Sequence, residues 1–106
     1  MNPQFKKGVL ELCVLSLLRS KDRYGYELTE TISKQMSVAA GTLYLLLKRL
    51  NDEGYFETYL VESESGPARK YYRLTDKGIE HENNLKNEWY TFIEQVDQLI
   101  KENPNE

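Results

Sequence analysis

The segment from Gly8 to Leu18 constrains the fold of this 106-residue chain most, because it is apolar on nearly every side. Only Glu11 and Ser16 interrupt its apolar residues. Its length and the charge of Glu11 favour a helix over a strand. A helix that is apolar all round must be covered on more than one side. Because the core of so short a chain covers one face, the segment predicts that a second subunit covers another.

Two further helices are predicted after a polar turn at residues 19–23. The second helix opens with Tyr24-Gly25-Tyr26-Glu27-Leu28, and Leu28 and Ile32 lie one turn apart on it. The third helix carries apolar residues at the spacing i, i+3, i+4, i+7, which is typical of one buried face. The residues of this leucine stripe are Leu43, Leu46, Leu47 and Leu50. Gly54 is expected to end the third helix in a left-handed conformation.

From residue 56 onward the pattern changes from helical to alternating, which indicates strands. Residues 56–62 are predicted to form one strand, residues 63–68 a turn or longer hairpin loop, and residues 69–74 the returning strand. Tyr72 shares a strand face with Leu74, so we expect Tyr72 to point inward and Tyr71 partly outward. Three helices and a two-stranded hairpin predict an α+β fold of the winged helix-turn-helix type.

A long last helix is predicted from about Asp76 to about Glu102, with Thr75 as its N-cap. Its apolar seam has the 4, 3, 4, 3 spacing of a coiled coil, which suits packing on a partner. The seam consists of Leu85, Trp89, Phe92, Val96 and Leu99, widened by Ile93 and Ile100. We therefore expect a winged-helix DNA-binding domain at residues 1–75, a dimerisation helix at residues 76–102 and a disordered tail at residues 103–106.

The charge of the chain is unevenly distributed, although its formal total is only −3. Residues 1–75 hold 11 Lys and Arg against 9 Asp and Glu, whereas residues 76–106 hold 3 against 8. In a winged helix the third helix enters the major groove and the hairpin contacts the neighbouring backbone. The mildly basic first part is therefore the expected DNA-facing part. Its candidate phosphate contacts are Lys48, Arg49, Arg69, Lys70 and Arg73.

Four motifs in order identify a resemblance to a known family. They are Tyr24-Gly25-Tyr26-Glu27-Leu28; Gly41-Thr42-Leu43-Tyr44 with Leu47-Lys48-Arg49-Leu50 and Glu53-Gly54; Gly66-Pro67-Ala68-Arg69-Lys70-Tyr71-Tyr72; and Leu74-Thr75-Asp76-Lys77-Gly78. Over roughly residues 5–100 the chain resembles the PadR-like transcriptional regulators, and its single last helix is similar to their small subfamily. The resemblance implies a winged helix-turn-helix repressor that dimerises through its C-terminal region and binds palindromic operator DNA.

Placement and resemblance together predict a set of DNA contacts. These are Tyr24, Gly41, Thr42, Tyr44, Lys48, Arg49, Gly66, Arg69 and Lys70. The chain departs from the family pattern at Leu45, where a proline is frequent, and at Ala39, where a serine is common. The third helix therefore lacks its oxygen cap unless Ser37 supplies one, a deficit of about 1 kcal/mol.

Trp89, the single tryptophan, has two interpretations. It is either a packed anchor of the dimer interface or a platform on which a planar molecule stacks between two subunits. The resemblance supports the second, because some members of the small subfamily bind flat hydrophobic drugs at the dimer interface. The predicted ligand pocket consists of Phe5, Gly8, Leu12, Ser16, Leu85, Trp89 and Ile93. The predicted dimer interface consists of Val9, Leu12, Leu85, Trp89, Phe92, Val96 and Leu99.

Other classes of function find little support in the sequence. One cysteine and one histidine exclude a disulfide framework and a Cys/His zinc site. Cys13 is expected to be a buried structural thiol, and His81 a solvated surface histidine. No catalytic constellation or phosphate-binding loop is visible, so we expect neither an enzyme nor a cofactor.

No apolar run approaches the ~20 residues that span a membrane, and no secretory signal is visible, so a cytoplasmic protein without a membrane partner is expected. Two alternatives to an effector-controlled homodimeric repressor remain at this point. The first is a DNA-binding dimer that has no ligand pocket and is controlled by its abundance. The second is a helix-mediated protein-interaction module, because the last helix is acidic.

Overall fold

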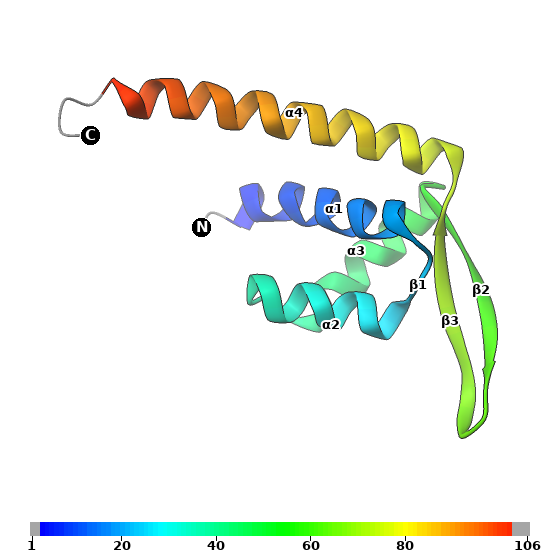
Figure 1. The fold of residues 1–106 in the computed structure, drawn as a ribbon. Helices are drawn as coiled ribbons and strands as arrows, with labels where there is room; N and C mark the ends of the chain where they lie inside the picture. Colours follow the sequence, from blue (N-terminus) through cyan, green and yellow to red (C-terminus); the bar gives the residue numbers. More distant parts are fainter. Residues whose placement is uncertain (1–2, 103–106) are drawn as a thin grey trace.

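The computed structural model describes residues 3–102, with side chains from Gly8 onward. Within them the helices and strands follow the predicted order, with one additional short strand (Figure 1). In chain order they are α1 Pro3–Ser20, β1 Arg23–Tyr24, α2 Gly25–Met36, α3 Ala40–Asp52, β2 Phe56–Ser63, β3 Gly66–Leu74 and α4 Asp76–Lys101. The predicted tail at residues 103–106 and the side chain of Phe5 lie outside the described part.

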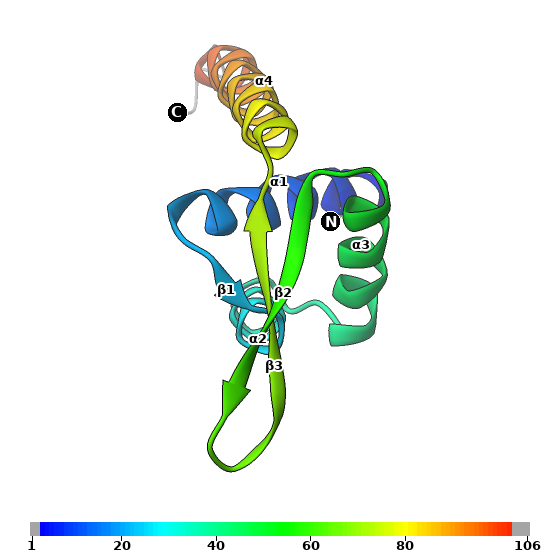
Figure 2. The same cartoon turned by 90° about the vertical axis from the view of Figure 1, so that its right-hand side faces the viewer.

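Helix α1 lies between α4 on one side and α2 and α3 on the other, as Figures 1 and 2 show. Its apolar sequence follows from this central position, because different neighbours cover its two sides. The sequence predicted a second subunit on one of these sides, but α4 of the same chain lies there. The leucine stripe of α3 is at most 7 % exposed, which confirms its prediction as a buried face. The core is completed by Leu10, Val14, Leu15, Leu18, Leu28, Ile32, Val38, Phe56 and Tyr72.

The antiparallel sheet has the strand order β1-β3-β2. The sequence predicted only the hairpin, because β1 has two residues and no alternating pattern of its own. The turn is shorter than expected: Ser63 pairs with Gly66, so β3 begins three residues earlier than predicted. A register shift after Val61 absorbs the odd residue beside Pro67, which has no N–H to donate to a ladder. Tyr72 is buried and Tyr71 half-buried, as expected.

The end of α3 and the start of α4 are fixed to each other. Gly54 follows α3 at φ 83°, which confirms the predicted left-handed residue. The Thr75 hydroxyl donates to the Gly54 carbonyl at 2.7 Å and accepts from the Gly78 N–H at 3.1 Å, so Thr75 caps α4 as predicted. A Cβ at Gly78 would lie 1.8 Å from the Tyr55 carbonyl oxygen, so only glycine permits this approach.

Helix α3 begins without a side-chain cap. Ala39 occupies its N-cap position and has no oxygen to offer. Ser37 does not replace it, because this residue ends α2 in the left-handed conformation at φ 53°. The structure therefore confirms that α3 has no side-chain cap, as the sequence predicts.

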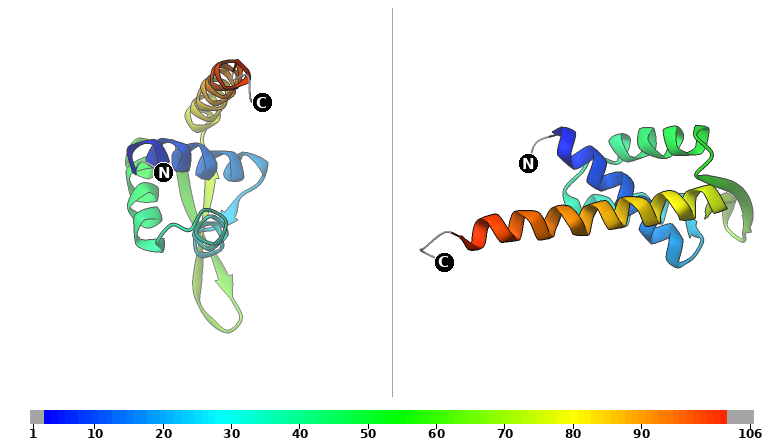
Figure 3. Two further views of the ribbon diagram at one scale, coloured as in Figure 1. Left: turned by 90° about the vertical axis from the view of Figure 1, so that its left-hand side faces the viewer. Right: turned by 90° about the horizontal axis from the view of Figure 1, so that it is seen from above.

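The distal half of α4 runs past the N-terminal end of α1, as Figures 1 and 3 show. Apolar side chains of this half reach solvent: Phe92 is 43 % and Leu99 72 % exposed. None of the helices within residues 3–102 is long and apolar enough to cross a membrane.

Candidate nucleic-acid interface

The outer face of α3 presents four of its predicted DNA contacts to solvent. Gly41, Thr42, Tyr44 and Lys48 are all exposed. The ammonium group of Lys48 lies 3.1 Å from the Asp52 carboxylate one turn away. Both partners are solvated, and such surface pairs contribute little, so the lysine can exchange this carboxylate for a phosphate at small cost.

Arg49 lies on the flank of α3 that faces α1. Its guanidinium donates to Glu11 at 3.1 Å and to Glu53 at 3.0 Å. Burial of the group opposes its charge, but the hydrogen bonds to Glu11 and Glu53 outweigh this and raise the pKa of Arg49. The arginine is thus held by two carboxylates, a placement that the helical spacing alone did not predict.

The prediction of a solvated surface histidine at position 81 is wrong. The His81 ring stacks on Tyr55 with ring centroids 4.1 Å apart and planes 9° from parallel. Its Nε2 atom lies 2.8 Å from the Glu11 carboxylate, and the side chain is only 25 % exposed. Glu11 of α1 therefore contacts Arg49 of α3 and His81 of α4 at once. The sequence does not indicate this contact, because the carboxylate partner of His81 is 70 residues away.

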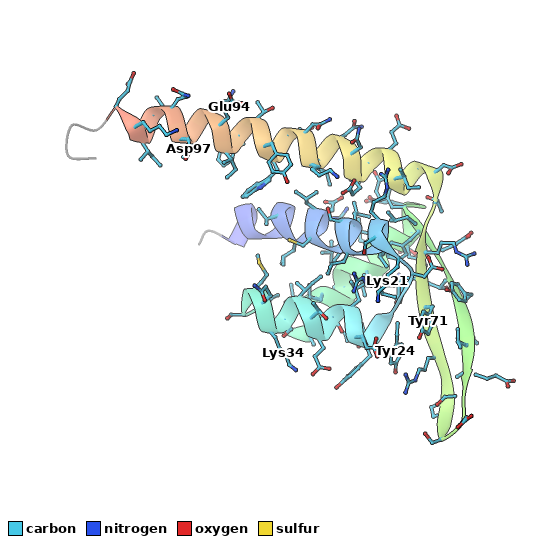
Figure 4. The ribbon with its side chains drawn as sticks, viewed as in Figure 1. Lys21, Tyr24, Lys34, Tyr71, Glu94 and Asp97 are labelled. Carbon is cyan, nitrogen blue, oxygen red and sulfur yellow. The ribbon has the colours of Figure 1, made fainter. Side chains whose placement is uncertain are left out.

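At the base of the wing, the hairpin formed by β2 and β3, three tyrosines form a ladder of rings. Tyr71 lies between Tyr24 and Tyr59, with ring centroids 6.0 Å and 5.7 Å apart. Figure 4 shows Tyr24 and Tyr71 close together where β1 joins the sheet. The guanidinium of Arg69 lies 5.0 Å from the Tyr24 ring centroid. The predicted contacts Tyr24 and Arg69, which are 45 positions apart, are thus brought together.

The remaining candidate contacts of the wing divide into two kinds. Lys70 is exposed, with its ammonium 5.9 Å from the Tyr72 ring centroid, and Gly66 is exposed beside the turn. Arg73 instead donates to Asp22 at 3.0 Å. The hydrogen bond to Asp22 and the nearby charge of this carboxylate raise the pKa of Arg73. The Tyr59 hydroxyl also donates to Asp22, at 2.7 Å.

A groove between α1 and α4 has a volume of about 310 Å³. It is lined by Gly8, Val9, Leu12, Leu85, Glu88, Trp89 and Phe92. Four of the residues predicted for a ligand pocket therefore meet here: Gly8, Leu12, Leu85 and Trp89. Ile93 is exposed and is not part of the lining, and Glu88 is a polar member that the sequence did not reveal.

Ser16, also predicted for the pocket, has a different role in the structure. Its hydroxyl donates to Glu82 at 2.8 Å, and the Glu82 side chain is 1 % exposed. The ammonium of Lys86 and the guanidinium of Arg19 lie 3.4 Å and 3.7 Å from the same carboxylate. Glu82 thus joins α4 to α1 through polar contacts. Its position in an acidic stretch gave no indication of burial, because its partners Ser16 and Arg19 are distant in sequence.

Cys13 is half-buried against the core, and burial raises the pKa of its thiol. The raised pKa keeps the thiol protonated and unreactive at neutral pH. The placement agrees with the expected structural role.

The fold and the surface of α3 and the wing define a winged-helix DNA-binding protein. A model of the "Transcriptional regulator PadR-like family" matches residues 14–83, and the chain belongs to this family. Its members are transcriptional regulators and not enzymes, so the protein is a DNA-binding regulator of transcription.

Solved structures agree with this assignment. A PadR-like transcriptional regulator from Bacillus cereus is 39 % identical with a TM-score of 0.82, covering 92 % of this chain and 96 % of that one. A transcriptional regulator from Streptococcus is 34 % identical with a TM-score of 0.83, covering 92 % and 98 %. A protein of Lysinibacillus sphaericus is 35 % identical over 99 residues, which are 90 % of this chain and 91 % of that protein.

Proposed function

We propose that the protein is a homodimeric repressor that binds an inverted repeat in operator DNA and is released by a planar hydrophobic effector. The observation that carries the proposal is the division of its exposed surface. Hydroxyl and basic groups that suit DNA face solvent on α3 and the wing, namely those of Thr42, Tyr44, Lys48, Arg69 and Lys70. On α4 a seam of apolar side chains faces solvent, including Phe92 and Leu99. The first surface suits DNA and the second a subunit, which corresponds to residues 1–75 and 76–102 as functional parts.

The DNA contacts that we propose come from α3 and the wing. Thr42, Tyr44 and Lys48 enter the major groove together with the exposed backbone at Gly41. Arg69 and Lys70 contact the phosphates beside it, and the wing backbone approaches them at Gly66. The ring of Tyr24 holds the Arg69 guanidinium, which reduces the entropy lost when it binds a phosphate. Arg49 serves mainly to fix α3, because Glu11 and Glu53 hold its charge.

The dimer that we propose covers the apolar seam of α4 and the outer side of α1. The exposed side chains of Phe92 and Leu99 lie on this seam, and Val96 between them is half-buried. Val9, Leu12, Leu85 and Trp89 continue the same apolar surface along the groove. In a two-fold dimer each contact occurs twice, so a short seam buries twice its own area.

An effector would occupy the groove beside Trp89. A volume of about 310 Å³ for one protomer is at the lower end of the range for small-molecule sites, and the two-fold dimer provides two such grooves. The two α3 helices, the recognition helices of the dimer, can have a spacing that fits DNA or one that does not. The effector releases the operator only if it binds the second spacing more tightly than the first. The groove has an apolar lining with a single carboxylate, that of Glu88. This lining suits a flat aromatic molecule that carries a positive charge.

Operator binding can be tested with the DNA upstream of the protein's own gene, which we expect to contain an inverted repeat. We expect Lys48→Ala and Arg69→Ala to weaken binding in a fluorescence anisotropy titration and to reduce its salt dependence by about one ion each per subunit. Lys34→Ala is the control, because the Lys34 ammonium pairs with Glu30 within α2 and Lys34 is not among the proposed contacts. Equal affinity for the upstream DNA and for random DNA at every salt concentration would contradict a repressor.

The dimer and the effector site need separate measurements. Light scattering after size exclusion should give the mass of a dimer, and a stable monomer at micromolar concentration would contradict the proposal. A planar cationic dye should bind saturably by the anisotropy of its own fluorescence, and Trp89→Ala should abolish this binding. The control is Tyr90→Ala, an exposed neighbour outside the groove lining. A dimer that binds its operator and no planar dye would instead be regulated by its abundance.

A further inference from the structure

The most exposed large apolar side chain within the described residues lies on the recognition helix. Leu45 is 73 % exposed, although the other leucines of α3 form its buried stripe. Successive residues of an α-helix are separated by about 100°. Gly41, Leu45 and Lys48 therefore form a row directly opposite Leu43, Leu47 and Leu50. Leu45 is at the centre of the outermost face of α3.

The neighbours of Leu45 on this face do not form an apolar patch. Gly41 has no side chain, and nothing lies within 4 Å of the place where its Cβ would be. Lys48 on the other side is charged and exposed. The apolar seam of α4 is continuous, as a subunit interface requires, but Leu45 is an isolated apolar group between a bare backbone and a cation.

A leucine at this position restricts which group of a base edge α3 can contact favourably. When α3 enters the major groove, its outermost face meets the bases, and Leu45 can neither donate nor accept a hydrogen bond. The polar edges of guanine, adenine and cytosine would lose water there without gaining a partner. The thymine 5-methyl group is the apolar group that this groove offers.

We propose that Leu45 contacts a thymine 5-methyl group in each half-site and thereby determines one base of the operator. The proposal rests on the proposed binding of an inverted repeat and adds the base that an apolar side chain recognises. The neighbouring Gly41 lets the backbone of α3 approach closely enough for this contact. In a two-fold dimer the contact occurs twice, at symmetric positions of the operator.

The test replaces thymine by deoxyuridine at one pair of symmetric positions at a time, which removes only the methyl groups. The duplex is selected from randomised DNA for tight binding, and both symmetric thymines of each pair are replaced together. Loss of one buried methyl group corresponds to about a fourfold weaker binding, so a symmetric pair should give about 15-fold. We expect this loss at one pair of positions. Protein with Leu45→Ala should bind the selected duplex more weakly and should not distinguish thymine from deoxyuridine at that pair.

Two control variants separate this contact from a general loss of affinity. Lys48→Ala should weaken binding to both duplexes equally and keep the ratio between them. Leu60→Ala changes an exposed leucine of β2 and should also keep the ratio. Circular dichroism should show that Leu45→Ala is folded, because the side chain that it removes lies outside the core.

The outcomes distinguish this inference from the function on which it rests. Specific binding with no loss at any deoxyuridine pair would overturn the role of Leu45 and leave the repressor proposal intact. A loss that persists unchanged in Leu45→Ala would assign the methyl contact to another residue and would likewise overturn it. Failure to select any duplex over random DNA would overturn both proposals together.

Discussion

Helices α3 and α4 each carry an apolar face built from residues three and four positions apart, but this face is buried in α3 and largely exposed in α4. The stripe of α3 is buried against α1, α2 and the sheet, whereas Phe92 and Leu99 of α4 face solvent. The spacing shows that one face of a helix is to be covered. It does not show whether the cover comes from the same chain or from another. The two helices therefore differ in what covers their apolar face: residues of the same chain cover that of α3, and in the proposed dimer a second subunit covers that of α4.

The two helices also begin differently. Thr75 satisfies an N–H of the first turn of α4 and fixes the helix to Gly54, whereas Ala39 offers α3 no such group. The start of α4 is stabilised by local hydrogen bonds. Since α3 lacks them, it depends on the packing of its leucines. Four substitutions test this contrast, in order of decreasing effect.

Leu43→Ala should have the largest effect, because it leaves a cavity in the core. We expect a loss of about 3 kcal/mol in the free energy of unfolding, measured by urea denaturation and circular dichroism. The matched control on the same helix is Leu45→Ala, which should change stability by less than about 0.5 kcal/mol. Equal losses for the two variants would show that α3 is buried differently from the structure.

Leu99→Ala should weaken the proposed dimer and leave the fold of each subunit intact. A loss of about 1 kcal/mol at each of two symmetric sites corresponds to a dimer dissociation constant about 30-fold higher, measured by analytical ultracentrifugation. The control is Tyr90→Ala, which lies off the apolar seam of α4. If the wild-type and Leu99→Ala proteins associate equally, α4 does not provide the interface.

Thr75→Val should cost about 1 kcal/mol, because it removes the hydroxyl that caps α4 and keeps the shape of the side chain. Thermal unfolding at constant protein concentration measures the change. Thr91→Val, in the exposed middle of α4, is the control and should be almost neutral. A neutral Thr75→Val would mean that the close packing of Gly78 against Tyr55 fixes the start of α4 without the cap.

Ala39→Ser should have the smallest effect and the opposite sign. A serine at the N-cap of α3 can accept from a free N–H of the first turn, so we expect a gain of about 0.5 kcal/mol. Ala40→Ser places the same hydroxyl one residue inside the helix and should give no gain. The same unfolding measurement applies, and equal changes for both would contradict an uncapped α3.

Local patterns predicted much of this fold from the sequence. The leucine stripe of α3, the left-handed Gly54, the cap at Thr75 and the bounds of α4 depend on neighbours within a few residues. The short strand β1 was missed, because it forms only through pairing with Tyr71 and Tyr72. The start of β3 was misplaced, because a bulge and not a loop absorbs the residues near Pro67.

The candidate site was less predictable wherever a contact joins distant segments. The burial of Glu82 and His81 depends on Ser16 and Glu11 of α1, more than 60 residues away in each case. The place of Ser16 on α1 predicts a pocket residue, but in the structure its hydroxyl donates to Glu82. Helical spacing identifies the side of a helix on which a residue lies, and the partner on that side requires the tertiary structure.

The close approach of Gly78 to Tyr55 has a mechanical consequence. It leaves no room for movement at the N-terminal end of α4, where α4 is joined to the end of the recognition helix α3. A helix of 26 residues is about 39 Å long, so a tilt of about 5° at its root displaces its far end by about 3 Å. In the proposed dimer, α4 would act as a lever that converts a small rotation into a large change at the subunit contact. The same lever works in reverse, so a ligand that wedges the two subunits apart would turn both recognition helices at once.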